Sequence, residues 1–198
     1  FYATDLMMKA RPYAQSGSAA PFHVYGTKRI GELYKRMRDV DDDCENLDDC
    51  VKLSEIYPFQ PFSVLNYRVT PLRAAHDPAE CCLIFLIEDE AGKTLLYGND
   101  TAYFPEETWE QLRGRRLDLV SLDCTMGILG DGATHMGWNG DVRTKERLEA
   151  MGCVHDNTVF ILNHFSHNCG HGLSHEEMEA LAAPKGFLVA CDGFTAEV

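Results

Sequence analysis

Strand-like and helix-like segments alternate through the second half of this chain, and that alternation restricts its possible folds more than any other feature. Strand patterns occur at residues 81–87, 94–97, 117–122, 159–162 and 187–190. Helix patterns lie among the later strands at residues 105–114, 142–151 and 174–184; Pro105 opens the first and Pro184 ends the last. This alternation indicates an α/β fold in which helices cover a sheet.

The first half of the chain is less regular. Residues 4–10 are good helix formers with no N-cap before them, so we expect a helix already under way there. A strand pattern at residues 22–25 is followed by a helix pattern at residues 27–37. Residues 51–56 and 63–69 are both predicted to be extended. We find no internal repeat and no low-complexity linker.

An acidic segment at residues 39–50 interrupts this half. It contains seven acids and no base: Asp39, Asp41, Asp42, Asp43, Glu45, Asp48 and Asp49. The glycine and the terminal glutamate of an EF-hand calcium loop are missing. We therefore expect a solvated surface insertion in a single domain spanning residues 1–198, although a calcium loop stays conceivable.

Charge and composition exclude several classes of function. The chain has 18 Lys and Arg against 31 Asp and Glu, a formal net charge of −13, so it lacks the basic surface that nucleic acids require. No apolar run approaches the roughly 20 residues of a membrane span. The eight cysteines are irregularly spaced and include no Cys-x-x-Cys pair. We expect reduced thiols, a cytoplasmic location and no partnership with nucleic acid or membrane.

Residues suited to binding metals follow the predicted strands in order. His76, Asp100, Asp123 and His164 each come at or just after a strand, and His135 lies in the glycine-rich loop after Asp123. Loops at strand ends carry functional side chains on a rigid scaffold. One histidine after a strand is more often structural than functional. Several such strand ends in order predict a shared site.

This order resembles the second half of a metallo-β-lactamase-fold hydrolase. The matching motifs are Gly-Asn-Asp-Thr at residues 98–101 and Asn-His-Phe-Ser at residues 163–166. The closing Ala-Cys-Asp-Gly at residues 190–193 resembles the tail of the phosphoribosyl cyclic phosphate phosphodiesterases. The resemblance covers roughly residues 51–198 and implies an αββα sandwich.

The resemblance also implies a metal centre. Its ligands would be His76 for one divalent ion, His164 for the other and Asp100 as the bridge, with Zn²⁺ or Mn²⁺ as the metals. Two such ions activate a hydroxide and stabilise both the attacking and the leaving oxygen of a phosphodiester. The implied substrate is a small phosphodiester, with cyclic phosphodiesters included.

Three further residues receive roles from the same resemblance. His135 matches the histidine that protonates the leaving alkoxide, so His135 and Asp100 are the expected catalytic residues. Asp123 and His167 are expected to hold the ligands in orientation. Capping of the glycine loop remains an equally good interpretation of Asp123.

The superfamily's earlier signature, His-x-His-x-Asp-His, does not occur in this chain. In relatives that signature directly precedes residues like those that open this sequence, so we expect a C-terminal portion of a longer metallohydrolase. Such a portion should bind metal weakly, turn over little and associate with itself, for example as a homodimer, through exposed strand edges.

Other interpretations stay open. A nuclease or tRNA-processing hydrolase of the same fold would share the ligands, although the acidic charge disfavours it. A degenerate member could bind a ligand or partner without catalysis. A separate structural zinc site is also possible, because five potential ligands lie close together in sequence: His164, His167, Cys169, His171 and His175.

Overall fold

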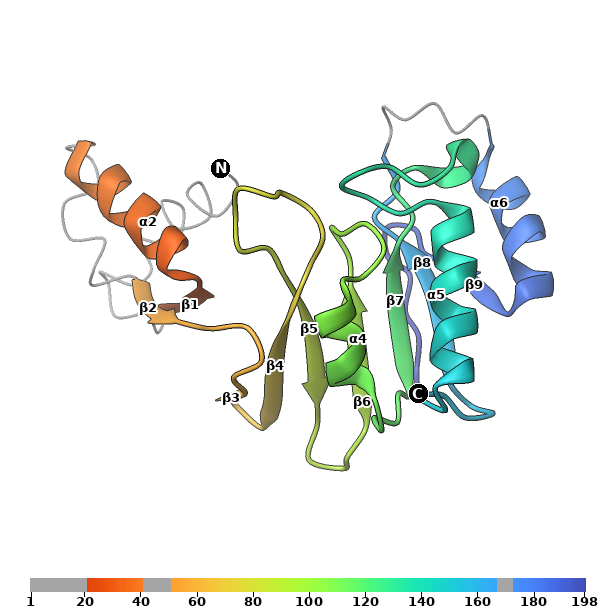
Figure 1. Cartoon of the computed structure of the whole chain (residues 1–198), viewed down its shortest axis with the longest axis horizontal. Coiled ribbons are helices and arrows are strands. Elements are labelled where there is room, and N and C mark those ends of the chain that lie inside the picture. The colour runs from red at the N-terminus through yellow and green to blue at the C-terminus, as the bar shows by residue number, and fades with distance from the viewer. Residues whose placement is uncertain (1–20, 41–50, 167–172) are drawn as a thin grey trace. The chain divides into compact units, whose positions relative to one another are not determined.

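The computed structural model describes residues 21–40, 51–166 and 173–198 (Figure 1). The chain divides into two compact units, residues 1–57 and residues 58–198. The helix predicted at residues 4–10 and most of the acidic segment lie outside the described residues.

The first unit is a β-α-β element. Strand β1 (Phe22–Gly26) pairs in parallel with β2 (Val51–Glu55), and helix α2 (Lys28–Val40) connects them in sequence. All three elements were predicted within a few residues. In this helix Tyr34 is buried, whereas Ile30 and Leu33 are more than 40% exposed.

The second unit contains a seven-stranded sheet in the order β3-β4-β5-β6-β7-β8-β9. Its strands are β3 (Phe62–Val64), β4 (Tyr67–Arg73), β5 (Leu83–Glu88), β6 (Thr94–Gly98), β7 (Leu119–Asp123), β8 (Val159–Asn163) and β9 (Phe187–Val189). Strands β3 to β6 pair antiparallel, and β6 to β9 pair in parallel. The predicted α/β fold is confirmed, and its sheet contains both antiparallel and parallel pairs of strands.

Two predictions about the early strands are corrected. Residues 63–69 form a hairpin between β3 and β4 rather than one strand, because Leu65 takes a left-handed conformation with φ 52° and reverses the chain. Leu65 is 93% exposed at this turn. Cys81 and Cys82, which the strand pattern at residues 81–87 includes, precede β5 and are only half-buried.

Three helices accompany the sheet: α4 (Glu106–Leu112), α5 (Trp138–Ala150) and α6 (His175–Ala182), with short 3₁₀ turns η2 (Gly127–Leu129) and η3 (Ala183–Lys185). The capping box predicted at the start of α6 is present, with Ser174 and Glu177 bonding each other's backbone amides. Helix α5 begins at Trp138, four residues before its predicted start. The Asp131 carboxylate accepts the Gly137 and Gly140 amides and so caps this early turn.

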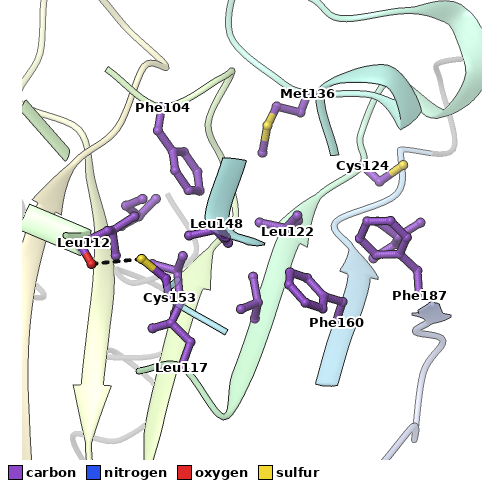
Figure 2. Packing of buried hydrophobic residues seen from close by; sticks show 14 of the residues in the cluster. Phe104, Leu112, Leu117, Leu122, Cys124, Met136, Leu148, Cys153, Phe160 and Phe187 are labelled. Atoms are coloured by element: carbon purple, nitrogen blue, oxygen red, sulfur yellow. Dashed lines mark hydrogen bonds between the residues drawn. The ribbon is translucent and has the colours of Figure 1, made fainter. Parts of the chain in front are cut away.

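The core lies between one face of the sheet and these helices. Figure 1 shows α4 and α5 over the same face. On that face Leu96, Val120, Phe160 and Phe187 are neighbours across four strands. Figure 2 shows the packed side chains, including Cys153, whose thiol donates to the Leu112 carbonyl at 3.2 Å. Buried Cys153 is a free thiol, as are the other cysteines in the described part of the chain.

Candidate metal centre

One edge of the sheet collects the residues predicted to bind metal. Strands β6, β7 and β8 are parallel, so Asp100, Asp123 and His164 follow their carboxyl ends at the same edge. Strand β4 is antiparallel to β5, which is antiparallel to β6, so β4 also ends at this edge and His76 follows it. The loop between β7 and α5 contributes His135.

The Asp100 carboxylate is the centre of this group. Its Oδ1 lies 3.5 Å from His76 Nε2, 3.7 Å from His135 Nδ1 and 3.8 Å from His164 Nε2. One ligand atom from each of Asp100, Asp123, His135 and His164 lies within 4.8 Å of all the others. Two ligands of one tetrahedral Zn²⁺, with bonds of about 2.0–2.1 Å, are separated by about 3.4 Å. The observed separations are close to that value.

Two of these residues occupy a strained backbone conformation. Asp100 has φ 61° and His164 has φ 62°, both in the left-handed region that most side chains avoid. The Asp100 side chain is 56% exposed, and three imidazoles surround its carboxylate. Strained residues of this kind cluster at functional sites, where the surrounding structure holds them.

Fixed hydrogen bonds define the proton positions on two histidines. His76 Nδ1 lies 3.0 Å from the Thr134 carbonyl, which only accepts, so Nδ1 carries the proton and Nε2 offers its lone pair beside Asp100. The Thr125 hydroxyl donates to the His164 carbonyl at 2.8 Å. Its oxygen is 2.7 Å from His164 Nδ1 and therefore accepts that proton. The Nε2 atom of His164 is likewise left as a metal-binding lone pair.

Asp123 is fully buried and orients His135. Its Oδ2 lies 2.9 Å from His135 Nδ1 and accepts the Thr101 amide at 2.9 Å. Its Oδ1 accepts the Thr125 amide at 2.9 Å. These donors occupy the carboxylate, and they fix the proton of His135 on Nδ1. The bond to the Thr125 amide is the local contact expected of a loop cap, and both roles of Asp123 stay predictions.

Thr101, the last residue of the Gly-Asn-Asp-Thr motif, connects the loops that carry the centre. The Ala75 amide donates to Thr101 Oγ1 at 2.9 Å, beside His76. The Met136 amide, next to His135, donates to the Thr101 carbonyl at 3.1 Å. Thr101 itself follows Asp100. Three loops distant in sequence are therefore held together through one residue.

The centre has an excess of negative charge. Within the described ranges, the ion-pair partners of Asp100 and Asp123 are histidines, with neither Lys nor Arg among them. Two carboxylates thus share an edge with three imidazoles whose Nδ1 atoms are already bonded. Carboxylate oxygens with imidazole nitrogens are a donor set that suits Zn²⁺ or Mn²⁺. The residues present fit a divalent metal ion.

Part of the histidine-rich segment cannot be placed. His167 and His171 lie outside the described residues. His175 begins α6 and pairs with Glu179, at 3.4 Å between Nε2 and Oε1. The expected orienting role of His167 and the alternative zinc site therefore stay predictions.

Comparison with known proteins identifies the family. The model of the beta-lactamase superfamily domain matches residues 4–165, which is most of the chain. The chain belongs to the beta-lactamase superfamily. No curated protein sequence matches it significantly.

Solved structures share this superfamily fold. The metallo-beta-lactamase fold protein YhfI from Bacillus subtilis is 18% identical with a TM-score of 0.67, covering 96% of this chain and 70% of that one. An isothiocyanate hydrolase from Delia radicum gut bacteria is 12% identical, with a TM-score of 0.62 and coverage of 94% and 70%. A possible metal-dependent hydrolase from Veillonella parvula is 12% identical, with a TM-score of 0.60 and coverage of 92% and 69%. At these identities the likeness concerns the fold.

None of the helices in the described part of the chain is long and apolar enough to cross a bilayer.

Proposed function

We propose that this superfamily member is a metal-dependent hydrolase of small phosphodiesters, with its centre at Asp100. One observation carries the proposal. The Nδ1 atoms of His76 and His164 are bonded to Thr134 and Thr125, so both Nε2 lone pairs are available next to the Asp100 carboxylate. This preorganised donor set matches the ligand order of metallohydrolases.

The metal would be held by His76 and His164 through Nε2 and by Asp100 through its carboxylate. When bound, a divalent ion supplies Lewis-acid stabilisation of the phosphoryl oxygens and lowers the pKa of water. Asp100 lies between the imidazoles, which suits it to bridge two ions. We expect Zn²⁺ or Mn²⁺.

His135 would donate the proton that the leaving alkoxide requires. Asp123 holds its Nδ1 proton, so its Nε2 is the nitrogen that exchanges protons with substrate. The buried carboxylate also fixes the orientation of the His135 ring, as in other oriented histidine catalysts. His135 is only one-fifth exposed, which limits competition from bulk water.

The substrate should be small. A chain with net charge −13 offers no electrostatic attraction for a long polyanion such as RNA. A single phosphodiester needs only the local positive charge that metal ions supply at the centre. The cyclic ribose phosphates are the leading candidates on the resemblance of residues 190–193.

The first experiment measures Zn²⁺ and Mn²⁺ affinity by isothermal titration calorimetry. His76→Ala and Asp100→Asn should each weaken binding at least tenfold, because each removes a donor atom. His23→Ala is the matched control, since His23 is exposed on β1 and should leave the affinity unchanged. Equal affinity in all four proteins would contradict the assignment of the centre.

The second experiment measures hydrolysis of bis(p-nitrophenyl) phosphate, a cyclic ribose phosphate and RNA. His135→Gln should lower kcat about 10²–10⁴-fold without changing metal affinity, because it removes proton donation alone. Faster hydrolysis of RNA would favour a nuclease, and metal binding without any turnover would favour a non-catalytic member. The same assay on a chain that includes the preceding reading frame tests the expectation that an upstream motif completes the ligand set.

A further inference from the structure

A pocket of about 610 Å³ adjoins the metal centre. It is formed by the carboxyl end of β8, the start of α6 and the segment after β9; its lining is Asn163, His164, Phe165, Ser166, Leu173, Ser174, His175, Met178, Val189, Ala190, Cys191 and Asp192. Because His164 belongs both to the lining and to the centre, the two are continuous.

The lining changes from apolar to polar with exposure. Met178 and Val189 are buried and Phe165 is half-buried, so the inner wall is apolar. His175 and Asp192 are exposed and stand toward solvent. Organic ligands bind in pockets of roughly 300–1,000 Å³ with an apolar wall and a few polar groups. The pocket has the size and the character for an aromatic or sugar-sized group.

The charge of the pocket is negative. Among its described lining residues there is no Lys or Arg, and Asp192 is an acid. Glu176 and Glu177, in the first turn of α6, stand in sequence between the lining residues His175 and Met178. A second phosphate or carboxylate in this pocket would be repelled.

We infer that this pocket binds the organic group of the substrate, and that this group is uncharged. This inference rests on the proposed function and names its substrate class. The substrate would be a phosphodiester whose single negative charge lies at the metal centre and whose organic group is uncharged. Esters carrying a second anion are disfavoured, among them cyclic ribose phosphates with a further phosphate, as are extended nucleotides. The substrate class is therefore narrower than the resemblance of residues 190–193 alone implies. The apolar wall contributes affinity because it removes the apolar surface of the organic group from water.

The test compares two phosphonates that cannot be hydrolysed, phenylphosphonate and methylphosphonate, by calorimetry on the Zn²⁺-loaded protein. The native chain should bind the phenyl compound at least tenfold more tightly. Ala190→Trp, which fills the pocket, should abolish that preference. Leu181→Trp, on the same α6 but outside the lining, is the control and should retain it. Equal affinity for both phosphonates in the native chain would overturn the inference.

A surface variant keeps the inference testable should Ala190→Trp fail to fold. Native protein should bind 4-carboxyphenylphosphonate several-fold more weakly than phenylphosphonate, because the added carboxylate meets Asp192. Asp192→Lys, at an exposed position, should reverse that order. An unchanged order in Asp192→Lys would contradict the charge argument.

Phenol separates the pocket from the metal centre. In metal-free protein, phenol should shift the NMR signal of the Met178 methyl group, and Ala190→Trp should remove the shift. If this holds while phosphonate binding proves independent of Zn²⁺, the proposed metal centre fails and the pocket stands. If phenol produces no shift at Met178, the pocket inference fails regardless of the metal.

Discussion

The two ends of strand β7 carry buried aspartates with similar surroundings and different consequences. Asp118 directly precedes the strand and Asp123 ends it. Each accepts a backbone amide, from Thr94 and Thr101 respectively, at 2.9 Å. Each also has a histidine nitrogen within 3.3 Å.

The aspartate at the amino end is electrically balanced. Lys93 Nζ lies 3.2 Å and His155 Nε2 3.3 Å from Asp118 Oδ1. Burial alone would raise the pKa of Asp118, but the Thr94 amide, Lys93 and His155 together outweigh burial and lower the pKa below its ordinary value. This end of the strand is a closed structural ion pair.

The aspartate at the carboxyl end lacks such a balance. Asp123 has His135 and His164 as partners, and a second carboxylate, Asp100, shares those imidazoles. No lysine or arginine compensates the two acids within the described chain. The absence of a Lys or Arg partner, rather than the mere presence of Asp and His, distinguishes the candidate metal centre from the structural ion pair.

The largest expected effect separates the two aspartates by metal affinity. Asp123→Asn should weaken Zn²⁺ binding about 10–100-fold, because Asp123 holds the Thr125 amide and Thr125 in turn orients the ligand His164. Asp118→Asn, at the other end of the same strand, should leave the affinity unchanged. Calorimetric titration of both variants makes the measurement. Equal losses of Zn²⁺ affinity in the two variants would show that Asp123 has no special role in metal binding.

The second prediction concerns stability at the amino end. Asp118→Asn should lower the free energy of unfolding by about 1–3 kcal/mol at pH 7, because Lys93 and the Thr94 amide lose a charged acceptor. The folded-state pKa of Asp118 is depressed, so its contribution is present above the ordinary value of 3.8 and lost as pH falls through the folded-state pKa. Urea unfolding at pH 7 and at pH 3 should show the difference between native and variant shrinking in acid. A constant difference would argue against the ion pair.

A third buried aspartate, Asp141, has its pKa shifted in the opposite direction from that of Asp118. Neither carboxyl oxygen of Asp141 forms a well-aligned hydrogen bond in the described structure, although the Cys124 thiol interacts with this carboxyl group. Burial, followed by the negative charges of Asp123 and Asp131, raises its pKa well above the ordinary value. The native chain therefore loses stability as pH rises above 3.8 until the folded-state pKa is reached.

Asp141→Asn should remove this pH-dependent loss. The stability gained over the native chain should grow by up to about 1.4 kcal/mol for each pH unit in that window. Thermal unfolding of both proteins between pH 5 and pH 8 measures the effect. A gain that does not change with pH would show that Asp141 is ionised in the folded state.

Strand ends were predictable from the sequence because apolar runs stop where polar residues begin. That pattern placed Asp100, Asp123 and His164 at one sheet edge, and the resemblance ordered their roles. The residues that fix the histidines were not predictable. The Thr134 carbonyl reaches His76 across 58 positions, and carbonyl groups leave no trace in sequence. Thr125 stands two residues after Asp123, which was a usable signal of a turn bonded by its aspartate.

Local errors had the same origin. The early start of α5 depends on Asp131, whose side chain reaches amides six and nine residues away. The turn at Leu65 was hidden because leucine favours neither turns nor positive φ. In both cases the fold overrides local preference.

The left-handed backbone of Asp100 and His164 narrows the choice of residues these positions accept. Apart from glycine, the side chains that tolerate this conformation best are Asn, Asp and His. Asp and His are also common metal ligands, so the left-handed backbone and the coordination chemistry favour the same small set of residue types. Substitutions tolerated at either position would then be mostly residues that can bind metal, or glycine. Valine or isoleucine would destabilise the folded chain through backbone strain, independently of any loss of metal binding.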